Sequence, residues 1–149
     1  MQSHFLSDAI VPQRAANATA AGTTAINGAT VDMQTAPTCR SCLFLAFLGA
    51  LTATQVTQLK MQVSDDGTTW ADAMVNGSIV QTAAAADADS NKILMLDVRY
   101  VGHRYVRPVL VRGTANAVLD AMISIPYEST AMPTIPSGLS KTAQFLNAV

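Results

Sequence analysis

The stretch from residue 56 to residue 70 constrains the fold of this chain more than any other part of the sequence. Over residues 56–64, apolar and polar side chains alternate, which is the pattern of a strand with one buried face. Asp66 and Gly67 follow, and glycine supplies the positive φ that a tight hairpin turn requires. The segment therefore predicts a half-buried strand that runs into a hairpin. The side chains expected on its buried face are Leu59, Met61 and Val63.

The rest of the central part of the chain carries similar signals. Its other segments rich in apolar and β-branched residues are 24–33, 43–51, 93–98, 105–112 and 118–125. They are short, they are separated by turn residues such as Asn76-Gly77, and none shows a long helical period. We therefore expect an all-β fold, an antiparallel β-sandwich of about seven or eight strands.

Three of these segments lead to more detailed expectations. Residues 43–51 form an unbroken apolar run, which predicts a buried strand. Pro108 cannot donate to a sheet, so it predicts an edge or a bulge within residues 105–112. Residues 118–125 alternate again. The side chains expected on one face of that strand are Leu119, Ala121, Ile123 and Ile125, with Asp120 and Ser124 on the other.

Both ends of the chain are interpreted as arms around a domain that spans residues 23–126. Residues 1–22 hold many small polar residues and little periodicity, and an amphipathic helix is an alternative there. In residues 127–149, prolines break regular structure before a short apolar tail. Because a free apolar tail is a liability, we expect Phe145 and Leu146 to dock on this chain or on a neighbour.

The chain has few charges. Charged residues make up 13% of it, about half the usual share, and the formal net charge is −1. Such a surface suits a protein that packs against copies or partners, and without a basic excess nucleic acid is not an expected partner. The longest apolar run falls short of the roughly 20 residues of a spanning helix, so we expect no membrane association. No signal peptide is recognisable, so we expect synthesis in a cytoplasm.

The sequence offers few of the patterns that carry chemistry. Cys39 and Cys42 have the spacing of a redox or zinc site, and His4 and His103 are isolated from them. We interpret the two cysteines as ordinary thiols at the start of a strand, with metal or redox chemistry as the alternative. Nucleophile and phosphate-loop motifs do not occur. The sequence therefore predicts a protein that is not an enzyme and that has no cofactor and no metal.

The turn after residue 63 allows a second interpretation. Residues 64–70 resemble the Asp-box of sialidases and related propellers, but Asp66 and Gly67 are adjacent where the box has a residue between them. The interpretation that we favour is a tight hairpin in which an Asp side chain caps the amides of its own turn, with Trp70 anchoring the next strand. A calcium site is the alternative, and it would need about six or more oxygen ligands.

Four of the nine Lys and Arg residues lie within fourteen positions of one another. They are Arg99, Arg104, Arg107 and Arg112, with Tyr100 and Tyr105 beside them. One interpretation is pairing within the chain, with Asp97, Asp120 or neighbouring carbonyl groups. The other is a basic stripe that faces an acidic partner, because the planar guanidinium fork binds carboxylates bidentately. His103 lies in the turn between and is expected at the surface, with a pH-sensitive contact as the alternative.

The order of these segments resembles that of small virion proteins of tailed bacteriophages. The resemblance covers about residues 23–126. It comprises a Thr- and Asn-rich opening strand, an apolar strand, an alternating strand that ends in SDDGTTW, a short apolar strand, RYVRP and a closing strand. The chain is thus similar to the capsid decoration, or cement, family, whose members are jelly-roll β-sandwiches. The resemblance implies a structural virion protein that binds the outside of a phage head and bridges major capsid protein subunits.

The resemblance also implies a homo-oligomer, a dimer or a trimer. One alternative is a phage tail-tube or head–tail connector protein, in which residues 83–89 could form the contact between rings. A second alternative is a carbohydrate-binding β-sandwich, which would need a row of exposed aromatic side chains. The residues predicted to bind a partner are Arg99, Tyr100, Arg104, Tyr105, Arg107, Arg112, Phe145 and Leu146.

Overall fold

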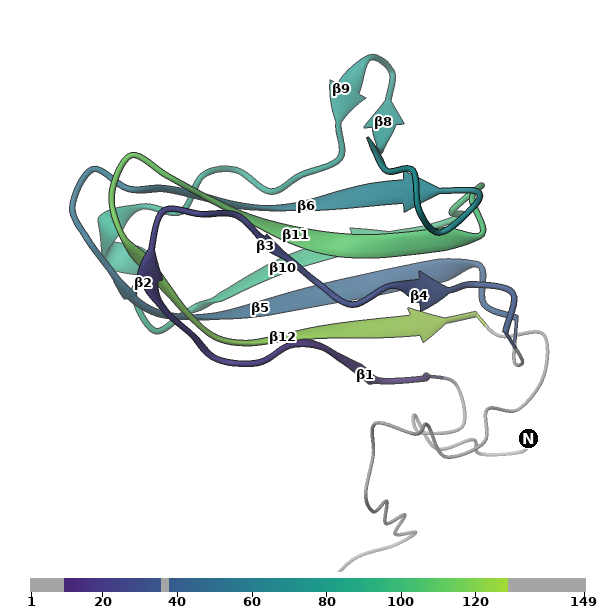
Figure 1. Ribbon diagram of the computed structural model, residues 1–149, viewed down its shortest axis with the longest axis horizontal. Coiled ribbons are helices and arrows are strands. Elements are labelled where there is room, and N and C mark those ends of the chain that lie inside the picture. The colour runs from purple at the N-terminus through teal and green to yellow at the C-terminus, as the bar shows by residue number, and fades with distance from the viewer. Residues whose placement is uncertain (1–9, 36–37, 129–149) are drawn as a thin grey trace, which may run out of the picture.

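The alternating segments pair into two antiparallel sheets that form a β-sandwich (Figure 1). The computed structural model describes residues 10–35 and 38–128. The first sheet contains β1 (Gln13–Ala16), β2 (Thr19–Gly22), β5 (Ser41–Leu51), β10 (Ile93–Val98) and β12 (Ala117–Tyr127). The second contains β3 (Ile26–Asn27), β4 (Val31–Asp32), β6 (Val56–Ser64), β7 (Ala71–Asp72) and β11 (Tyr105–Gly113). A separate hairpin joins β8 (Met74–Val75) to β9 (Ser78–Ile79), and Asp87–Asp89 form a short 3-10 turn, η2. The predicted all-β sandwich is confirmed.

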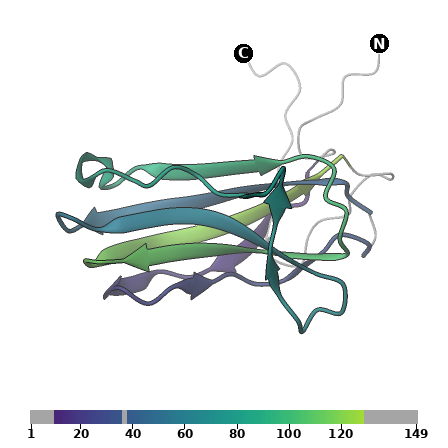
Figure 2. The ribbon, with the colours of Figure 1, turned by 90° about the horizontal axis from the view of Figure 1, so that it is seen from above.

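The chain passes from one sheet to the other and back between successive long strands. β1 and β2 both pair with β12, so they act as one broken strand, and β3 and β4 pair with β11 in the same way. The first sheet then has the order β1/β2–β12–β5–β10, and the second has the order β3/β4–β11–β6–β7. Figure 2 shows the long strands of both sheets running along a common axis. This order of eight antiparallel strands contains two Greek keys and is a jelly roll, the topology that the resemblance implied.

β6 shows how the sequence pattern becomes the core. Leu59 and Met61 are 0% and 3% exposed, whereas Gln58 and Lys60, on the other face of the strand, remain half-buried. Phe44 of the first sheet lies in the same core and is fully buried. Burying a large apolar side chain contributes about 1.5–3 kcal/mol, so these inward faces hold the two sheets together. The buried face predicted for residues 56–64, with Leu59, Met61 and Val63, is confirmed, whereas Ser64 is buried as well.

Pro108 lies neither at an edge nor at a bulge, which corrects the sequence prediction. β11 is flanked on one side by β6 and on the other by β3 and β4. The carbonyl of Pro108 accepts a hydrogen bond from the Gly28 amide at 2.8 Å. Because the N–H and C=O of one strand residue point the same way, the missing N–H faces the break between β3 and β4. β11 itself is therefore continuous at Pro108. The proline is accommodated because the neighbouring strand is interrupted between β3 and β4 and needs no hydrogen-bond donor there.

The faces predicted for β12 are wrong beyond Leu119, because the strand contains a bulge. The pairing with β5 shifts register between Leu119 and Ala121, and an extra residue reverses which side chains point inward. Met122 is therefore buried, whereas Ile123 and Ile125 face outward. Gly49 lies opposite the bulge, where an added Cβ would come within 2.8 Å of the Val118 and Asp120 side chains.

The boundaries of the predicted arms also change. Residues 13–22 form β1 and β2 and pair with β12, so they belong to the sandwich instead of an N-terminal arm. Their side chains are mostly small, so no alternation marked them as strands. Tyr127 ends β12, and residues 1–9 and 129–149, with Phe145 and Leu146, lie outside the described residues. Within the described ranges, no helix has the length and hydropathy to cross a membrane.

Candidate interaction surfaces

A single carboxylate holds the loop that follows β6. Asp66 Oδ1 accepts hydrogen bonds from the Thr69 and Thr68 amides at 2.7 and 2.8 Å, and from the Ser64 hydroxyl at 2.9 Å. These bonds, led by the Thr69 amide, hold the pKa of Asp66 below its usual range. Gly67 has a φ of 74°, which completes the turn. The carboxylate therefore caps its own turn, as the hairpin interpretation predicted.

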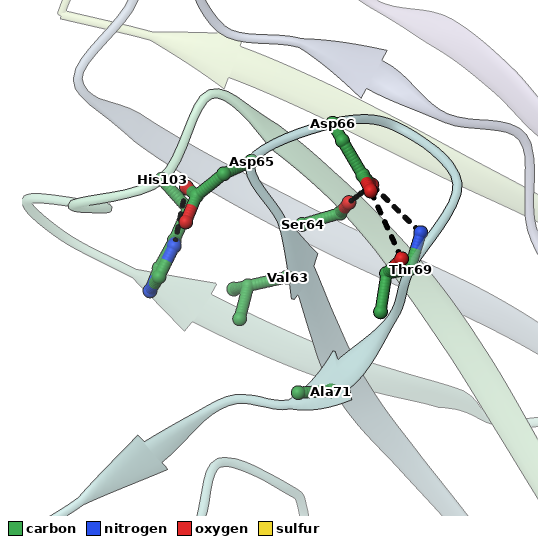
Figure 3. Close-up of a pocket in the computed structure, with 7 residues that line it drawn as sticks. All are labelled: Val63, Ser64, Asp65, Asp66, Thr69, Ala71 and His103. Carbon is green, nitrogen blue, oxygen red and sulfur yellow. Dashed lines mark hydrogen bonds and ion pairs between the residues drawn. The ribbon is translucent and has the colours of Figure 1, made fainter.

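A pocket of about 350 Å³ lies beside this loop (Figure 3). His103 lines it, with Nδ1 at 2.8 Å from Asp65 Oδ1, and both side chains are exposed. The two carboxylates at the pocket thus already have partners, because Asp65 contacts the imidazole and Asp66 caps its turn. Among residues 10–35 and 38–128, no group of three or more His, Cys, Asp or Glu side chains could hold a metal ion.

The two cysteines lie in the core at and just before the start of β5. Cys42 is 0% exposed and Cys39 is 6% exposed. Burial raises the pKa of both thiols, most strongly that of Cys42. A buried thiol with a raised pKa is a poor nucleophile and a poor metal ligand. The placement agrees with the interpretation of two ordinary thiols.

Arg99 and Tyr100 lie where β10 leaves the first sheet. The Arg99 guanidinium lies 5.4 Å from the centre of the Tyr100 ring and donates to Glu128 Oε1 at 2.6 Å. Glu128 also accepts a hydrogen bond from the buried Ser41 hydroxyl. Tyr100 itself is 69% exposed and adopts a φ of 55°, so the chain turns sharply there. This corner presents an exposed aromatic ring beside a charged pair.

Arg104 and Tyr105 lie a few residues further on, where β11 begins. The Arg104 fork donates to both oxygens of Asp32 at 3.0–3.3 Å and lies 4.8 Å from the Tyr105 ring centre. The hydrogen bond from Arg104 is the main reason that the pKa of Asp32 falls from 3.8 to about 2. The arginine is therefore paired within the chain, although its side chain remains 46% exposed.

The pair formed by Arg104 and Asp32 predicts a pH-dependent contribution to stability. Because the pKa of Asp32 is lower in the folded chain, the contribution is complete above about pH 3.8 and declines as pH falls toward 2. We expect Asp32→Asn to lower the melting temperature at pH 6 and to have little effect near pH 2. Thermal unfolding of both proteins at pH 6, 4 and 2 measures this. A difference in melting temperature that is constant across these pH values would contradict the assignment.

Arg107 belongs to a polar network on the outer face of the second sheet. Its guanidinium stacks at 4.2 Å on the Trp70 ring and donates to Gln62 Oε1 at 2.7 Å. Gln62 and Lys60 in turn donate to the Asp72 carboxylate at 2.9 Å each. Every polar group named here has a partner on a neighbouring strand. This face is therefore polar, and its polar side chains are hydrogen-bonded to one another.

Arg112 is buried, which separates it from the other predicted partner-binding residues. It is 7% exposed, and it donates to the carbonyl groups of Thr24, Ala20 and Ala117 at 2.7–2.9 Å. Four arginines close in sequence therefore do not form one stripe. Arg99 and Arg104 share one end of the sandwich, Arg107 lies on a sheet face and Arg112 lies inside. Neither Asp97 nor Asp120 is the carboxylate that pairs with Arg99 or Arg104.

The hairpin formed by β8 and β9 stands clear of both sheets (Figure 1). Met74, Val75 and Ile79 are 56%, 58% and 40% exposed. Asn76 and Gly77 have φ values of 51° and 79°, as a two-residue turn of this hand requires. A largely apolar cleft of about 440 Å³ lies between the hairpin and residues 98–103. The hairpin therefore presents three large apolar side chains to solvent beside an apolar cleft.

The outer face of the first sheet is apolar, in contrast to that of the second. β-Sheet register places its side chains in rows across β10, β5 and β12. The rows are Ile93–Phe47–Ala121, Met95–Leu45–Ile123 and Asp97–Leu43–Ile125. Ile93 and Met95 are 52% and 64% exposed, and the other apolar members are half-buried. We call the eight apolar members of these rows the apolar face.

Sequence reasoning missed both apolar surfaces. The run over residues 43–51 predicts a buried strand, but only one of its faces is in the core: Phe44 points inward, whereas Leu43 and Leu45 point outward. The signal was present, since a strand that is apolar on both faces needs a cover for each. In the hairpin, the apolar side chains on both sides of Asn76-Gly77 were a comparable signal, because an isolated two-stranded hairpin has no core of its own to bury them.

The fold and these surfaces define a jelly-roll β-sandwich with apolar side chains on a projecting hairpin and on one sheet face. The sequence matches no known family model, and no curated protein matches it. The fold is similar to that in the crystal structure of PBSX exported protein XepA, with a TM-score of 0.53 and 19% sequence identity. The match covers 99% of this chain and 46% of XepA, so the chain spans less than half of that protein. At this identity, the likeness concerns the fold alone.

Proposed function

We propose that this chain is a structural protein of a phage particle that binds the outer surface of the head and bridges major capsid protein subunits. The observation that carries the proposal is the β8–β9 hairpin, which presents Met74, Val75 and Ile79 to solvent. The jelly-roll topology supports it, because this is the fold of the decoration family that the sequence resembles. The fold neighbour XepA shares this fold.

The hairpin has the properties of a binding element that needs no chemistry. Large apolar side chains in the centre of an interface and polar or charged groups at its rim are the usual arrangement. Here the apolar tip lies beside the cleft that Tyr100 and Arg99 help to line. Tyr100 offers an exposed ring and Arg99 a charged group for such a rim. In this proposal the chain has no enzymatic activity, needs no cofactor and acts at the virion surface.

Binding to many identical sites at once would give this protein its affinity for the head. A head offers many identical sites, and a dimer or trimer of this chain would engage several at once, so that modest single contacts add up to stable binding. The proposal includes a homo-oligomer for this reason. A tail-tube or connector role is the second candidate, since a projecting β-hairpin is also suited to contacts between stacked rings.

The test uses bare heads assembled from the major capsid protein of the same genome. The chain carrying Met74→Ser and Ile79→Ser is compared with the unchanged chain by co-sedimentation with these heads. We expect the variant to lose about ten-fold or more in affinity, because central apolar contacts contribute more than ~1 kcal/mol each. Its melting temperature should stay close to that of the unchanged chain, since neither side chain is buried.

Val56→Ser is the matched control, because Val56 is another exposed apolar residue, 39% exposed, and begins β6 away from the hairpin. It should bind heads as the unchanged chain does. Equal loss in both variants would indicate a general loss of apolar surface and not a site. Failure of the unchanged chain to bind heads, with rings or tubes in electron micrographs, would replace the decoration role with the second candidate.

A further inference from the structure

The apolar face lacks a cover among the described residues. Its centre is the row Met95–Leu45–Ile123, where Met95 is 64% exposed. Three adjacent strands contribute to it, so it is a continuous surface and not a set of scattered side chains. Two charged residues lie at its rim. Arg14 is opposite Ile123 in the backbone pairing of β1 with β12, and Asp97 accepts a hydrogen bond from Tyr127.

We propose that the C-terminal segment of the same chain, residues 129–149, docks on the apolar face. The first argument is where that segment begins. Tyr127 is the last residue of β12, and its hydroxyl donates to Asp97 Oδ1 at 2.6 Å, on the last row of the face. Glu128 is fixed by Arg99 and Ser41. The segment therefore leaves from the border of the surface that it covers.

The second argument is length and composition. The apolar face extends over three rows and three strands, which corresponds to roughly 13 Å by 10 Å between backbone positions. Residues 129–149 could span about 70 Å when extended, so the whole face is within reach. The segment contains one charged side chain, Lys141. Its apolar side chains nearest the end are Leu139, Phe145, Leu146 and Val149.

The third argument concerns which copy supplies the segment. A tethered segment has an effective concentration on the order of millimolar at its own docking surface. At micromolar protein concentrations, the segment of the same chain therefore outcompetes that of a second copy. Docking within one chain also removes apolar surface that would otherwise favour aggregation. The inference does not depend on the capsid proposal.

Methionine methyl NMR of the full chain tests the docking. Met95 and Met74 have similar exposures, 64% and 56%, but only Met95 lies on the apolar face. In the unchanged chain, a soluble paramagnetic agent should broaden the Met74 methyl signal and spare that of Met95. With Phe145→Asp and Leu146→Asp together, the broadening of Met95 should rise to the level of Met74. The buried Met61 and Met122 methyls report that the fold is intact.

The control is Ser137→Asp with Ser140→Asp, which adds the same charge to the same segment without removing apolar groups. This variant should leave Met95 protected. Equal broadening of Met95 and Met74 in the unchanged chain would overturn the proposal. Protection of Met95 that disappears on dilution, together with a change in sedimentation, would also overturn it and would assign the face to a second copy.

Discussion

Replacing Arg112 with methionine is expected to lower the free energy of unfolding by about 3 kcal/mol or more. Methionine replaces the aliphatic part of the arginine side chain but not its guanidinium, so the loss reports mainly on the guanidinium and the space that it fills. Without it, the carbonyl groups of Thr24, Ala20 and Ala117 lose their donor at 2.7–2.9 Å. Two of these carbonyls, those of Ala20 and Thr24, belong to the N-terminal part of the sandwich, so we expect β1 and β2 to loosen first. Urea unfolding measures the total loss.

Arg104→Met is the matched control for this experiment. The Arg104 guanidinium also makes several hydrogen bonds, but its partner Asp32 and its own side chain reach solvent. Exposed ion pairs contribute about 0–1 kcal/mol, so this variant should lose less than a third of what the Arg112 variant loses. Equal losses would show that the three buried hydrogen bonds of Arg112 contribute no more than an exposed ion pair. Arg112→Lys should recover only part of the loss, since an ammonium group cannot reproduce the planar fork.

Phe44→Ala is expected to lower the free energy of unfolding by about 3–5 kcal/mol. Phe44 is 0% exposed and is one of the largest side chains in the core between the two sheets. Truncation removes its apolar contacts and leaves a cavity that β-sheet backbone on both sides cannot close. Chemical unfolding of the variant, with an unchanged dependence on denaturant concentration, would measure this as a change in stability alone.

Phe47→Ala provides the comparison on the same strand. Phe47 points to the opposite side of β5 and lies on the apolar face, where it is half-buried. Its truncation removes a similar volume, but the cover over Phe47 would come from the docked segment and not from a second sheet, so we expect a smaller loss of about 1–2 kcal/mol. A loss as large as that of Phe44→Ala would mean that the outer face is covered as completely as the core. The ratio of the two losses in unfolding free energy therefore measures how completely the apolar face is shielded from solvent in the full chain.

Local signals were enough to predict the strands in the middle of the chain. The alternation over residues 56–64 and the turn at Asp66-Gly67 depend on neighbours along the sequence, and both were predicted correctly. The bulge in β12 depends on Gly49, which lies about 70 positions earlier in the chain and leaves no mark on the pattern of β12 itself. A single extra residue reverses every later side chain, so the error at Ile123 follows from one unseen contact.

Surface residues were harder to assign for a different reason. An arginine in a strand can point into the core or toward solvent. The sequence does not show whether the core contains carbonyl groups that can accept its hydrogen bonds. Arg112 meets three of them, whereas Arg104, eight residues earlier, meets a carboxylate at the surface. The predicted stripe grouped the two because they are near in sequence. The β1 and β2 strands were missed because alanine and threonine give no contrast between inside and outside.

The contrast between the two outer faces has a consequence for the molecule as a whole. The outer side of the second sheet carries the polar side chains of Arg107, Gln62 and Asp72, whereas the outer side of the first sheet carries the apolar side chains of Leu45 and Met95. With its apolar face uncovered, such a domain would be amphiphilic and would adsorb at an air–water boundary with that face toward the air. Surface tension therefore reports whether the apolar face is covered. A chain whose C-terminal segment covers this face should lower the surface tension of water far less than a chain in which the face is exposed.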